Sequence, residues 1–514
     1  MKLWIAIAFV LYLILLMAIG ILSTRKNASA SDYFLGSRNI GAWTTAFSAS
    51  ASDMSGWLLM GLPGSIYAFG TNQAWIAVGL FIGTVLNWVI VASRLRKYTI
   101  RANDSLTIPE FLSNRFNDRT QILKIISAIV IAFFFTLYAA SAFSAIGKFF
   151  STVLNIDYHL ALVIGAFSVL LYTFLGGYFA VCQTDVLQGL IMLAGIISVP
   201  ILAAVFMGKS HIVPNLVDSN LGMRASDYLN VFSDADGSIK ATSVISQLSW
   251  GLGYCGMPHI LVRFMSAKNE KELSKSRKIA IVWALLALLV ACIIGVLGRA
   301  YLYPTVLSNS GAQYENVYIE MIMKMFVNET SFPFIAGILL CGILAAIMST
   351  ADSQLLVSSS SVSQDLCKTV FRKNVKDVTL LMIGRVSVLL ITVIAVLIAW
   401  KPDASIMKLV SNAWAGLGAA FGPTILLSLY WKRMNLKGAF AGMISGSAVV
   451  ILWDYLKIIK YHGSYVTLST CTGIYSLLIG FFVSLICIIL VSLLTKKPNE
   501  EIINQFNDVN NGMI

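Results

Sequence analysis

The sequence predicts an all-α polytopic membrane protein, and three observations lead to this fold class. Of the 514 residues, 58% are apolar and only 12% are charged, whereas soluble domains carry about 25% charged residues. The mean hydropathy is +0.80. The apolar residues fall in blocks of about 20, which is the length of helix that crosses the hydrocarbon core of a bilayer. We therefore expect one transmembrane unit over residues 1–514, with no separate soluble domain.

Thirteen apolar blocks are long enough to be membrane-spanning helices. We predict them at 3–23, 41–66, 71–93, 121–149, 158–178, 183–207, 241–263, 278–302, 332–353, 377–399, 406–431, 437–457 and 471–494. If the N-terminus is outside, about two thirds of the Lys and Arg residues, Arg263 among them, lie in cytoplasmic segments, as the positive-inside rule requires. We therefore expect an outside N-terminus, an inside C-terminus and a flexible cytoplasmic tail over 495–514.

Neither the net charge of +13 nor the seven cysteines favour a class of protein other than a membrane protein. The basic residues lie in short clusters between apolar blocks and not on one face, so we do not expect nucleic-acid binding. The cysteines are scattered without Cys-x-x-Cys spacing, which favours small core residues over disulfides or metal ligands. The chain also lacks a phosphate-loop motif and a His-Glu-x-x-His motif, which argues against a primary pump.

The second and seventh predicted spans contain residues that interrupt helices. Residues 48–64 read SASASDMSGWLLMGLPG, and residues 246–259 read SQLSWGLGYCGMPH. Unwound backbone at membrane depth is tolerated only where protein or water satisfies it, and paired interrupted helices indicate the binding site of a secondary transporter. The alternative is that glycines and other small residues only allow close helix packing.

The interrupted spans lie five apart along the chain, which fits two five-helix repeats in opposite membrane orientations. We predict repeat 1 over 41–207 and repeat 2 over 241–431. The extra first helix, 3–23, precedes them, and two helices over 437–494 follow.

Four aspartates fall within or beside predicted spans. Asp53 lies in the interrupted second span, where a charge is costly and is expected to face a cavity or a partner. Asp185 is placed either for a functional role or to cap the N-terminus of the sixth span. Asp352 and Asp454 lie near predicted span ends, where we expect solvated structural positions.

The ninth span carries a group of oxygen atoms on one helix face. The carbonyl of Ala346 and the hydroxyls of Ser349 and Thr350 converge, because residues three and four apart are neighbours on a helix. Carbonyls of the interrupted second span, around Ala51 and Met54, would complete an oxygen cage for sodium. Alternatively, the two hydroxyls only bond back to carbonyls of their own helix.

Three motifs resemble the sodium/solute symporter family, and the first of them is typical of its proline-transporting branch. They are ASDMSGW with MGLPG over 51–64, WGLGY with PH over 250–259, and LAA with MST over 344–350. The resemblance covers nearly the whole chain and implies the leucine-transporter fold, with ten core helices in two inverted repeats. It implies a sodium-coupled symporter that imports L-proline across the bacterial cytoplasmic membrane, without an organic cofactor or an obligate protein partner.

The resemblance also implies roles for individual residues. Sodium would be bound by Ala51, Met54, Ala346, Ser349 and Thr350. The substrate would be bound or its site shaped by Asp53, Ser55, Gly56, Trp57, Tyr138, Trp250, Tyr254 and Pro258. Arg38 and Asp185 would couple transport to sodium.

Two alternatives stay open at this point. The chain differs from the family pattern at Gln183, Cys255 and Met257, so it could transport another small solute, such as pantothenate, another amino acid or a carboxylate. A channel or an intramembrane enzyme that uses Asp53 and Asp185 is the other alternative, although no concentration of acids and histidines supports it.

Overall fold

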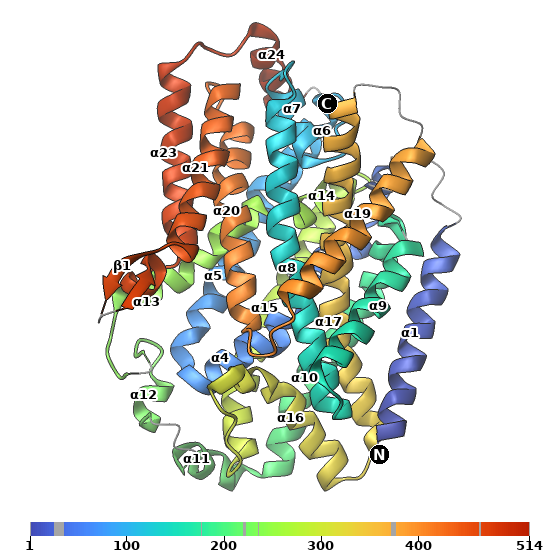
Figure 1. Ribbon diagram of the computed structural model, residues 1–514, viewed down its shortest axis with the longest axis vertical. Helices are drawn as coiled ribbons and strands as arrows, with labels where there is room; N and C mark the ends of the chain where they lie inside the picture. Colours follow the sequence, from blue (N-terminus) through green and yellow to red (C-terminus); the bar gives the residue numbers. More distant parts are fainter. Residues whose placement is uncertain are drawn as a thin grey trace.

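The computed structural model describes residues 2–24, 35–175, 177–218, 223–234, 236–371, 377–461 and 464–512. It is a bundle of long helices, and the two chain ends lie at opposite ends of the bundle (Figure 1). Within this part of the chain, ten helical segments are long and apolar enough to cross a membrane. The opposite placement of the termini is the one expected for an odd number of spans.

Eight of these long segments are single helices, and two are composite. The single helices are α1 (Lys2–Thr24), α8 (Ile122–Leu154), α10 (Tyr178–Met207), α15 (Glu270–Leu302), α19 (Asp377–Ile398), α20 (Ile406–Tyr430), α21 (Leu436–Tyr455) and α23 (Ser476–Leu494). One composite segment joins η3 (Thr71–Gln73), α5 (Ala74–Leu86), η4 (Asn87–Val91) and α6 (Ala92–Arg101), and the other joins α17 (Pro333–Ser360), η8 (Ser361–Cys367) and the start of α18 (Lys368–Phe371). The helix α9 (Tyr158–Leu175) is shorter but also apolar.

The second and seventh predicted spans are interrupted, as the sequence predicts. The second consists of α3 (Ala42–Asp53), the π-helical turn η2 (Trp57–Gly61) and α4 (Leu62–Phe69). The seventh consists of α13 (Ala241–Leu248), the 3-10 helix η5 (Ser249–Gly256) and α14 (Pro258–Ser266). Serine and glycine weaken the first helix at its break, and a proline at the first position of α14 suits a new helix start.

The helix α17 forms the centre of the bundle. Its residues from Leu340 to Ser360 are buried, and it packs against α1, α8, α10 and α19. Small Gly, Ala and Ser side chains make this possible, because they let neighbouring backbones approach closely. Both α3 and α14 pack against α17, whereas η5 packs between α5 and α20, so α17 brings the two interrupted spans together.

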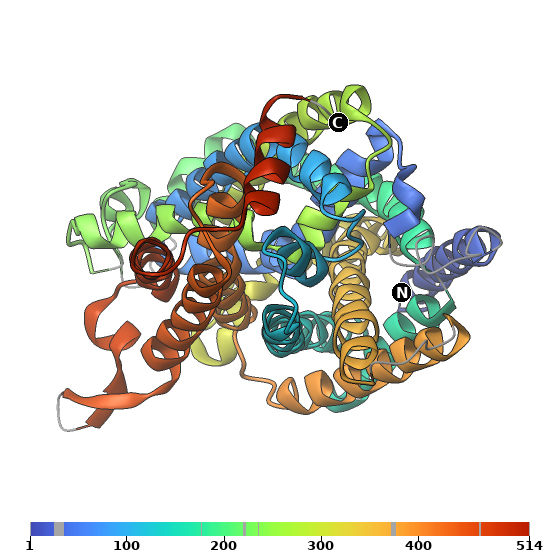
Figure 2. The same cartoon turned by 90° about the horizontal axis from the view of Figure 1, so that it is seen from above.

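The connections contain more structure than the sequence indicated. Loop 208–240 carries α11 (Lys209–Asp218) and α12 (Ala225–Leu229), and loop 303–331 carries η6 (Ser310–Asn316), α16 (Val317–Met323) and η7 (Lys324–Glu329). On the opposite side of the bundle, α7 (Ile108–Arg115) precedes α8, and η8 (Ser361–Cys367) and α18 (Lys368–Phe371) follow α17. A hairpin of β1 (Lys457–Tyr461) and β2 (Ser464–Thr467), followed by α22 (Leu468–Thr472), lies at the edge opposite α1 (Figure 2).

The expectation of a flexible tail is wrong. Residues Glu500–Asn510 form the helix α24, which packs against α6. Its apolar side chains Ile502, Phe506 and Val509 recur every three or four residues and are buried. This short amphipathic pattern lies within a segment of polar composition, which is why hydropathy alone does not indicate a helix there.

Candidate functional site

The interruption after Asp53 frees backbone groups in the middle of the bundle. Met54 leaves the helical conformation with φ −89° and ψ 80°, and its N–H still donates to the Ser50 carbonyl at 3.0 Å. The indole N–H of Trp57 donates to the Asp53 carbonyl at 3.0 Å. Met54 and Ser55 are both buried, so the open backbone faces protein interior.

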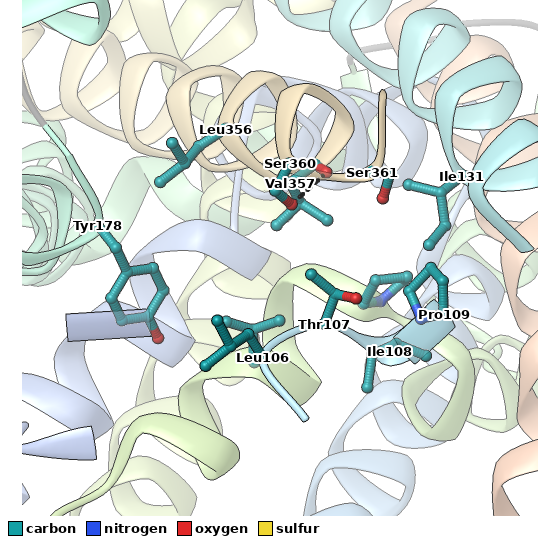
Figure 3. Close-up of a pocket in the computed structure, with 12 residues that line it drawn as sticks. Leu106, Thr107, Ile108, Pro109, Ile131, Tyr178, Leu356, Val357, Ser360 and Ser361 are labelled. Atoms are coloured by element: carbon teal, nitrogen blue, oxygen red, sulfur yellow. Dashed lines mark hydrogen bonds between the residues drawn. The ribbon is translucent and has the colours of Figure 1, made fainter. Parts of the chain in front are cut away.

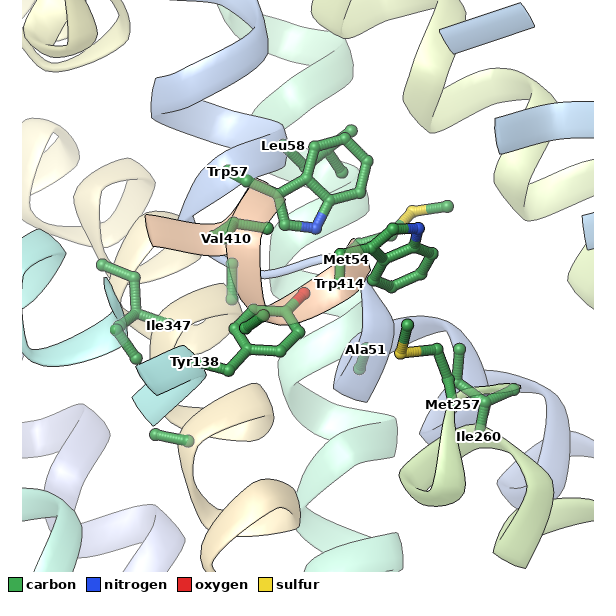
Figure 4. Packing of buried hydrophobic residues seen from close by; sticks show 14 of the residues in the cluster. Ala51, Met54, Trp57, Leu58, Tyr138, Met257, Ile260, Ile347, Val410 and Trp414 are labelled. Carbon is green, nitrogen blue, oxygen red and sulfur yellow. The ribbon is translucent and has the colours of Figure 1, made fainter. Parts of the chain in front are cut away.

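Four of the five predicted sodium ligands lie together where α3 meets α17. The Ser349 hydroxyl is 2.8 Å from the carbonyl oxygen of Ala51 and 3.2 Å from that of Ala346. The Thr350 hydroxyl is 3.3 Å and 3.1 Å from the same two oxygens. The hydroxyls therefore bond within their own helix and also reach the end of the interrupted one. Met54 follows Asp53 at the break, and its side chain is buried nearby (Figure 4).

Asp53 links the two interrupted spans. The Tyr254 hydroxyl on η5 donates to Asp53 Oδ2 at 2.6 Å. The other carboxylate oxygen, Oδ1, is buried and has no hydrogen-bond partner among the described residues. A buried carboxylate with an open acceptor position is costly, which indicates a place for a polar ligand group.

The predicted aromatic residues form part of a larger aromatic cluster. Trp57 and Tyr138 are buried and turn toward Trp414, a residue of α20 (Figure 4). Tyr254 packs edge-on against Trp414, with ring centroids 5.1 Å apart, and the Trp414 indole donates to the Trp250 carbonyl at 2.8 Å. The sequence analysis missed Trp414, although it is the one aromatic residue in a run of small residues, AWAGLGAA.

Trp250 faces a second residue that the sequence analysis missed. Its ring stacks on Tyr475, with centroids 5.0 Å apart and planes 23° apart. Tyr475 precedes α23, outside the predicted core repeats. No local pattern in the sequence pairs it with the seventh span.

Gly56 and Pro258, which were expected to shape the substrate site, lie in different parts of the structure. A Cβ atom on Gly56 would lie 3.0 Å from Ala145 Cβ and 3.2 Å from an Ile347 carbon, so Gly56 allows α3, α8 and α17 to meet. Pro258 begins α14 and lines a small cavity between α7, α8 and the end of α17 (Figure 3). No contact that the structure records joins Pro258 to the aromatic cluster in the described part of the chain.

A comparison with protein-family models identifies this arrangement. The model described as "Sodium:solute symporter family" matches residues 33–446, which is most of the chain. The chain belongs to the sodium:solute symporter family. This membership makes it a multi-pass membrane transporter and not an enzyme, so the alternative of an intramembrane enzyme is excluded.

Curated relatives and solved structures agree with the family. A sodium/proline symporter of Staphylococcus aureus is 42% identical over 513 residues, covering 98% of this chain and 95% of the relative. A second, from strain JH9, is 43% identical over 514 residues with the same coverage. A solved sodium-coupled sialic acid symporter, described as substrate-bound and outward-open, aligns over 96% of this chain and 98% of its own at 18% identity, with a TM-score of 0.75.

A more distant structure supports the same fold class. A nucleobase-cation-symport-1 family transporter in a closed conformation aligns over 94% of this chain and 99% of its own, with 14% identity and a TM-score of 0.52. The chain thus has the leucine-transporter-like fold that the sequence predicts.

In this member of the symporter family, Asp185 does not cap a helix. The helix α10 begins at Tyr178, with Gly177 as its N-cap, so the capping interpretation is wrong. Asp185 is fully buried, accepts from the Ser48 hydroxyl at 2.6 Å and pairs with Arg263 at 3.4 Å. Arg263 also donates to Ser353 on α17 at 2.6 Å.

Two sequence expectations about charged residues near this network are therefore wrong. Arg263, counted among the cytoplasmic loop charges, is 1% exposed and lies within α14. Asp352, expected near a solvated span end, is 0% exposed within α17. Both errors arise because α14 and α17 continue past the predicted ends of their spans, into packed protein.

Arg38, the other predicted coupling residue, joins three segments at the end of the bundle that carries α6 and α7. Its guanidinium pairs with Asp104 at 2.7 Å and donates to the carbonyls of Met265 and Ser105, each at 2.8 Å. Burial lowers the pKa of Arg38 from its usual value, and Asp104 opposes this change. The contacts tie the start of the second span to the ends of α6 and α14, and no recorded contact joins Arg38 to the oxygen cluster within the described residues.

Proposed function

We propose that this symporter imports L-proline together with sodium by alternating access, driven by the sodium electrochemical gradient. The observation that carries the proposal is the contact of the Ser349 and Thr350 hydroxyls with the Ala51 carbonyl, at the broken end of α3. The bond from the Trp57 indole to the Asp53 carbonyl, two residues beyond Ala51, supports a solute site next to this oxygen cluster. The 42% identity to a protein named sodium/proline symporter supports the choice of solute.

In the proposed mechanism, sodium binds between the broken second span and α17. The carbonyls of Ala51, Met54 and Ala346 and the hydroxyls of Ser349 and Thr350 would provide its oxygen ligands, because unwound carbonyls coordinate sodium in transporters of this design. The ion would replace the hydroxyl-to-carbonyl hydrogen bonds across the interface. It would thereby fix the angle of α3 against α17.

Proline would bind beside the ion, in the aromatic cluster. Tryptophan and tyrosine faces cover an apolar ring and attract a cation, which suits Trp57, Tyr138, Trp250 and Tyr254. The open Oδ1 of Asp53 is available to the secondary ammonium group. Backbone N–H groups at the start of the half-helix after Ser55 and Gly56 suit the carboxylate, because they lie at the positive end of a helix dipole.

The remaining assignments rest on the resemblance of the motifs to the family. We propose that Pro258 and Gly56 shape the helix junctions around the site, and that Arg38 and Asp185 transmit sodium binding to the cytoplasmic side. We further propose that repeat 1 spans 41–207 and repeat 2 spans 241–431, so that each contributes one interrupted helix. The cytoplasmic tail 495–514 then includes α24.

The sodium gradient supplies enough free energy for accumulation. At about 150 mV one charge yields about 3.5 kcal/mol, and a tenfold sodium gradient adds about 1.4 kcal/mol. Together these would sustain a proline gradient of roughly 10³ with one sodium per proline. No ATP is required.

The test is uptake of labelled proline into proteoliposomes under an imposed sodium gradient. We expect uptake that stops when potassium replaces sodium outside. Excess pantothenate, other amino acids or carboxylates added one at a time distinguish another solute of the family. Uptake that persists unchanged in potassium would refute sodium coupling. Uptake that unlabelled proline does not reduce would show that proline is not the transported solute.

Variants of the oxygen cluster test the sodium ligands. Ser349→Ala and Thr350→Ala should each raise the sodium concentration that gives half-maximal uptake. A matched control is Ser363→Ala, because Ser363 is buried in η8 and bonds to the Ser359 carbonyl one turn earlier in the same helical segment. If the control and the site variants shift the sodium dependence equally, Ser349 and Thr350 are not ligands.

A further inference from the structure

One face of α17 and η8 carries polar side chains whose hydrogen-bonding atoms are buried but unused. Gln354, Ser358 and Ser361 each have such an atom, with no hydrogen-bond partner in the described ranges. Oδ2 of Asp365 is also buried without a hydrogen-bond partner within those ranges. All four side chains are at most 1% exposed. Leaving a buried polar group unsatisfied costs about 1–3 kcal/mol each, so this set is expensive.

These residues follow one stripe of the helix. Their positions lie four, three and four residues apart, which keeps them on the same side of a helix. Extended by four residues toward the N-terminus, the stripe reaches Thr350, a member of the oxygen cluster. From Thr350 to Asp365 it covers about 20 Å along the helix axis, from the rise of about 1.5 Å per residue.

Neighbouring serines of the same segment that lie off this face do form hydrogen bonds. Ser359 donates to the Gly384 carbonyl at 2.9 Å, Ser360 to the Val357 carbonyl at 2.8 Å, and Ser363 to the Ser359 carbonyl at 2.8 Å. Serines off the stripe are thus satisfied in the usual way. Those on the stripe remain available.

One member of the stripe, Ser361, lines the small cavity of Figure 3 together with Leu356, Val357 and Ser360 of the same helical segment. Ser361 lies across this cavity from Thr107 and Pro109, beside Ile131 of α8. The space amounts to about 10 Å³, close to the minimum that a single water needs. Pro258 and Val262 of the interrupted seventh span complete the lining, so a movement of α14 away from α17 would widen it.

Asp365 ends the stripe on the cytoplasmic side. Its Oδ1 accepts from the Thr107 hydroxyl at 2.9 Å and lies 3.6 Å from the Lys124 ammonium group. The segment lies toward the end of the bundle that carries α6, α7 and α24 (Figure 1), which the charge distribution places in the cytoplasm. A carboxylate there with a free oxygen and a long, weak ion pair is suited to exchange its partner for another cation.

From these observations we infer that the face of α17 from Thr350 to Asp365 is the route by which sodium leaves for the cytoplasm, and that Asp365 is a second, transient cation site on this route. When α14 moves aside, water enters the cavity at Ser361 and extends along the stripe to the unpartnered polar atoms of Ser358 and Gln354. Sodium then passes along these oxygens and exchanges with Lys124 at Asp365. The inference rests on the proposed sodium coupling.

The test compares sodium dependence on the two sides of the membrane for Asp365→Asn. In proteoliposomes of uniform orientation, we expect the external sodium concentration for half-maximal uptake to change less than about twofold. The internal sodium concentration for half-maximal proline efflux should rise about tenfold, because the variant loses a charged ligand only on the inside. Asp365→Glu should restore it. If Asp365→Asn affected sodium dependence equally on both sides, or on neither, Asp365 would not be a cation site on the exit route.

A second measurement does not depend on the folding of Asp365 variants. Ser361→Cys and Ser363→Cys, each in a Cys367→Ser background, are treated from the cytoplasmic side with a charged thiol reagent during efflux. We expect modification of Ser361→Cys only, since the Ser363 hydroxyl faces α19, 3.6 Å from the position that a Cβ on Gly384 would occupy. No reaction at Ser361→Cys, or equal reaction at Ser361→Cys and Ser363→Cys, would refute the proposal that the exit route passes Ser361. If the parent transports proline without sodium, the proposed function fails; if only these variants behave unexpectedly, the exit route fails.

Discussion

The close approach of Gly83 on α5 to Gly251 on η5 allows a quantitative prediction about η5. A Cβ atom added to Gly83 would overlap the Gly251 carbonyl oxygen and lie 2.6 Å from Gly251 Cα, whereas ordinary contacts begin at 3.4 Å. In Gly83→Ala the 3-10 helix that carries Trp250 and Tyr254 therefore has to move away from α5 by about 1 Å. Overpacking of this kind costs about 1–3 kcal/mol.

The displacement should affect binding more than it affects folding. Because misplacing binding groups by about 1 Å can cost about a hundredfold, we expect the half-saturating proline concentration to rise about tenfold to a hundredfold. Equilibrium binding of labelled proline to purified protein, at saturating sodium, measures it. Gly20→Ala is the control, because a Cβ there meets nothing within 4 Å among the described residues. Unchanged proline affinity in Gly83→Ala would refute the reasoning.

Three further variants test other parts of the structure. Tyr254→Phe removes the donor to Asp53 and should weaken proline binding about tenfold or more, since bonds to charged groups contribute about 1.5–3 kcal/mol; an unchanged binding isotherm contradicts this. Glu315→Ala leaves the buried Lys148 without its 2.8 Å partner and should destabilise the protein by about 3–5 kcal/mol, seen as earlier thermal unfolding. Phe506→Ala should release α24, detected as faster hydrogen exchange there, with little change in proline binding.

The controls for these variants use residues with similar contacts elsewhere. For Tyr254→Phe the control is Tyr158→Phe, whose hydroxyl donates at 2.7 Å to the Ala399 carbonyl, a neutral group. For Glu315→Ala it is Glu272→Ala, whose carboxylate pairs with Lys275 in a more exposed position. Surface pairs contribute about 0–1 kcal/mol, so only Glu315→Ala should shift unfolding strongly.

The sequence by itself determined the features that depend on local composition. Apolar blocks of membrane-spanning length identify the fold class, because the cost of exposing polar groups to lipid acts on each segment separately. The breaks after Asp53 and before Pro258 were predictable for the same reason, since Ser, Gly and Pro weaken a helix wherever they stand. Ser349 and Thr350 could each be placed near the Ala346 carbonyl from their spacing of three and four residues alone.

Only the tertiary structure decided which of these segments meet. The contact between Ala51 and Ser349 spans 298 residues of chain, and the stacking of Trp250 on Tyr475 joins the seventh span to a helix outside the repeats. Arg263 is buried because Asp185 and Ser353 come to it from other helices. Hydropathy is a property of each segment, whereas a partner for a buried charge exists only after packing, and for this reason the ion pair, Trp414 and the docking of α24 became visible only in the folded chain.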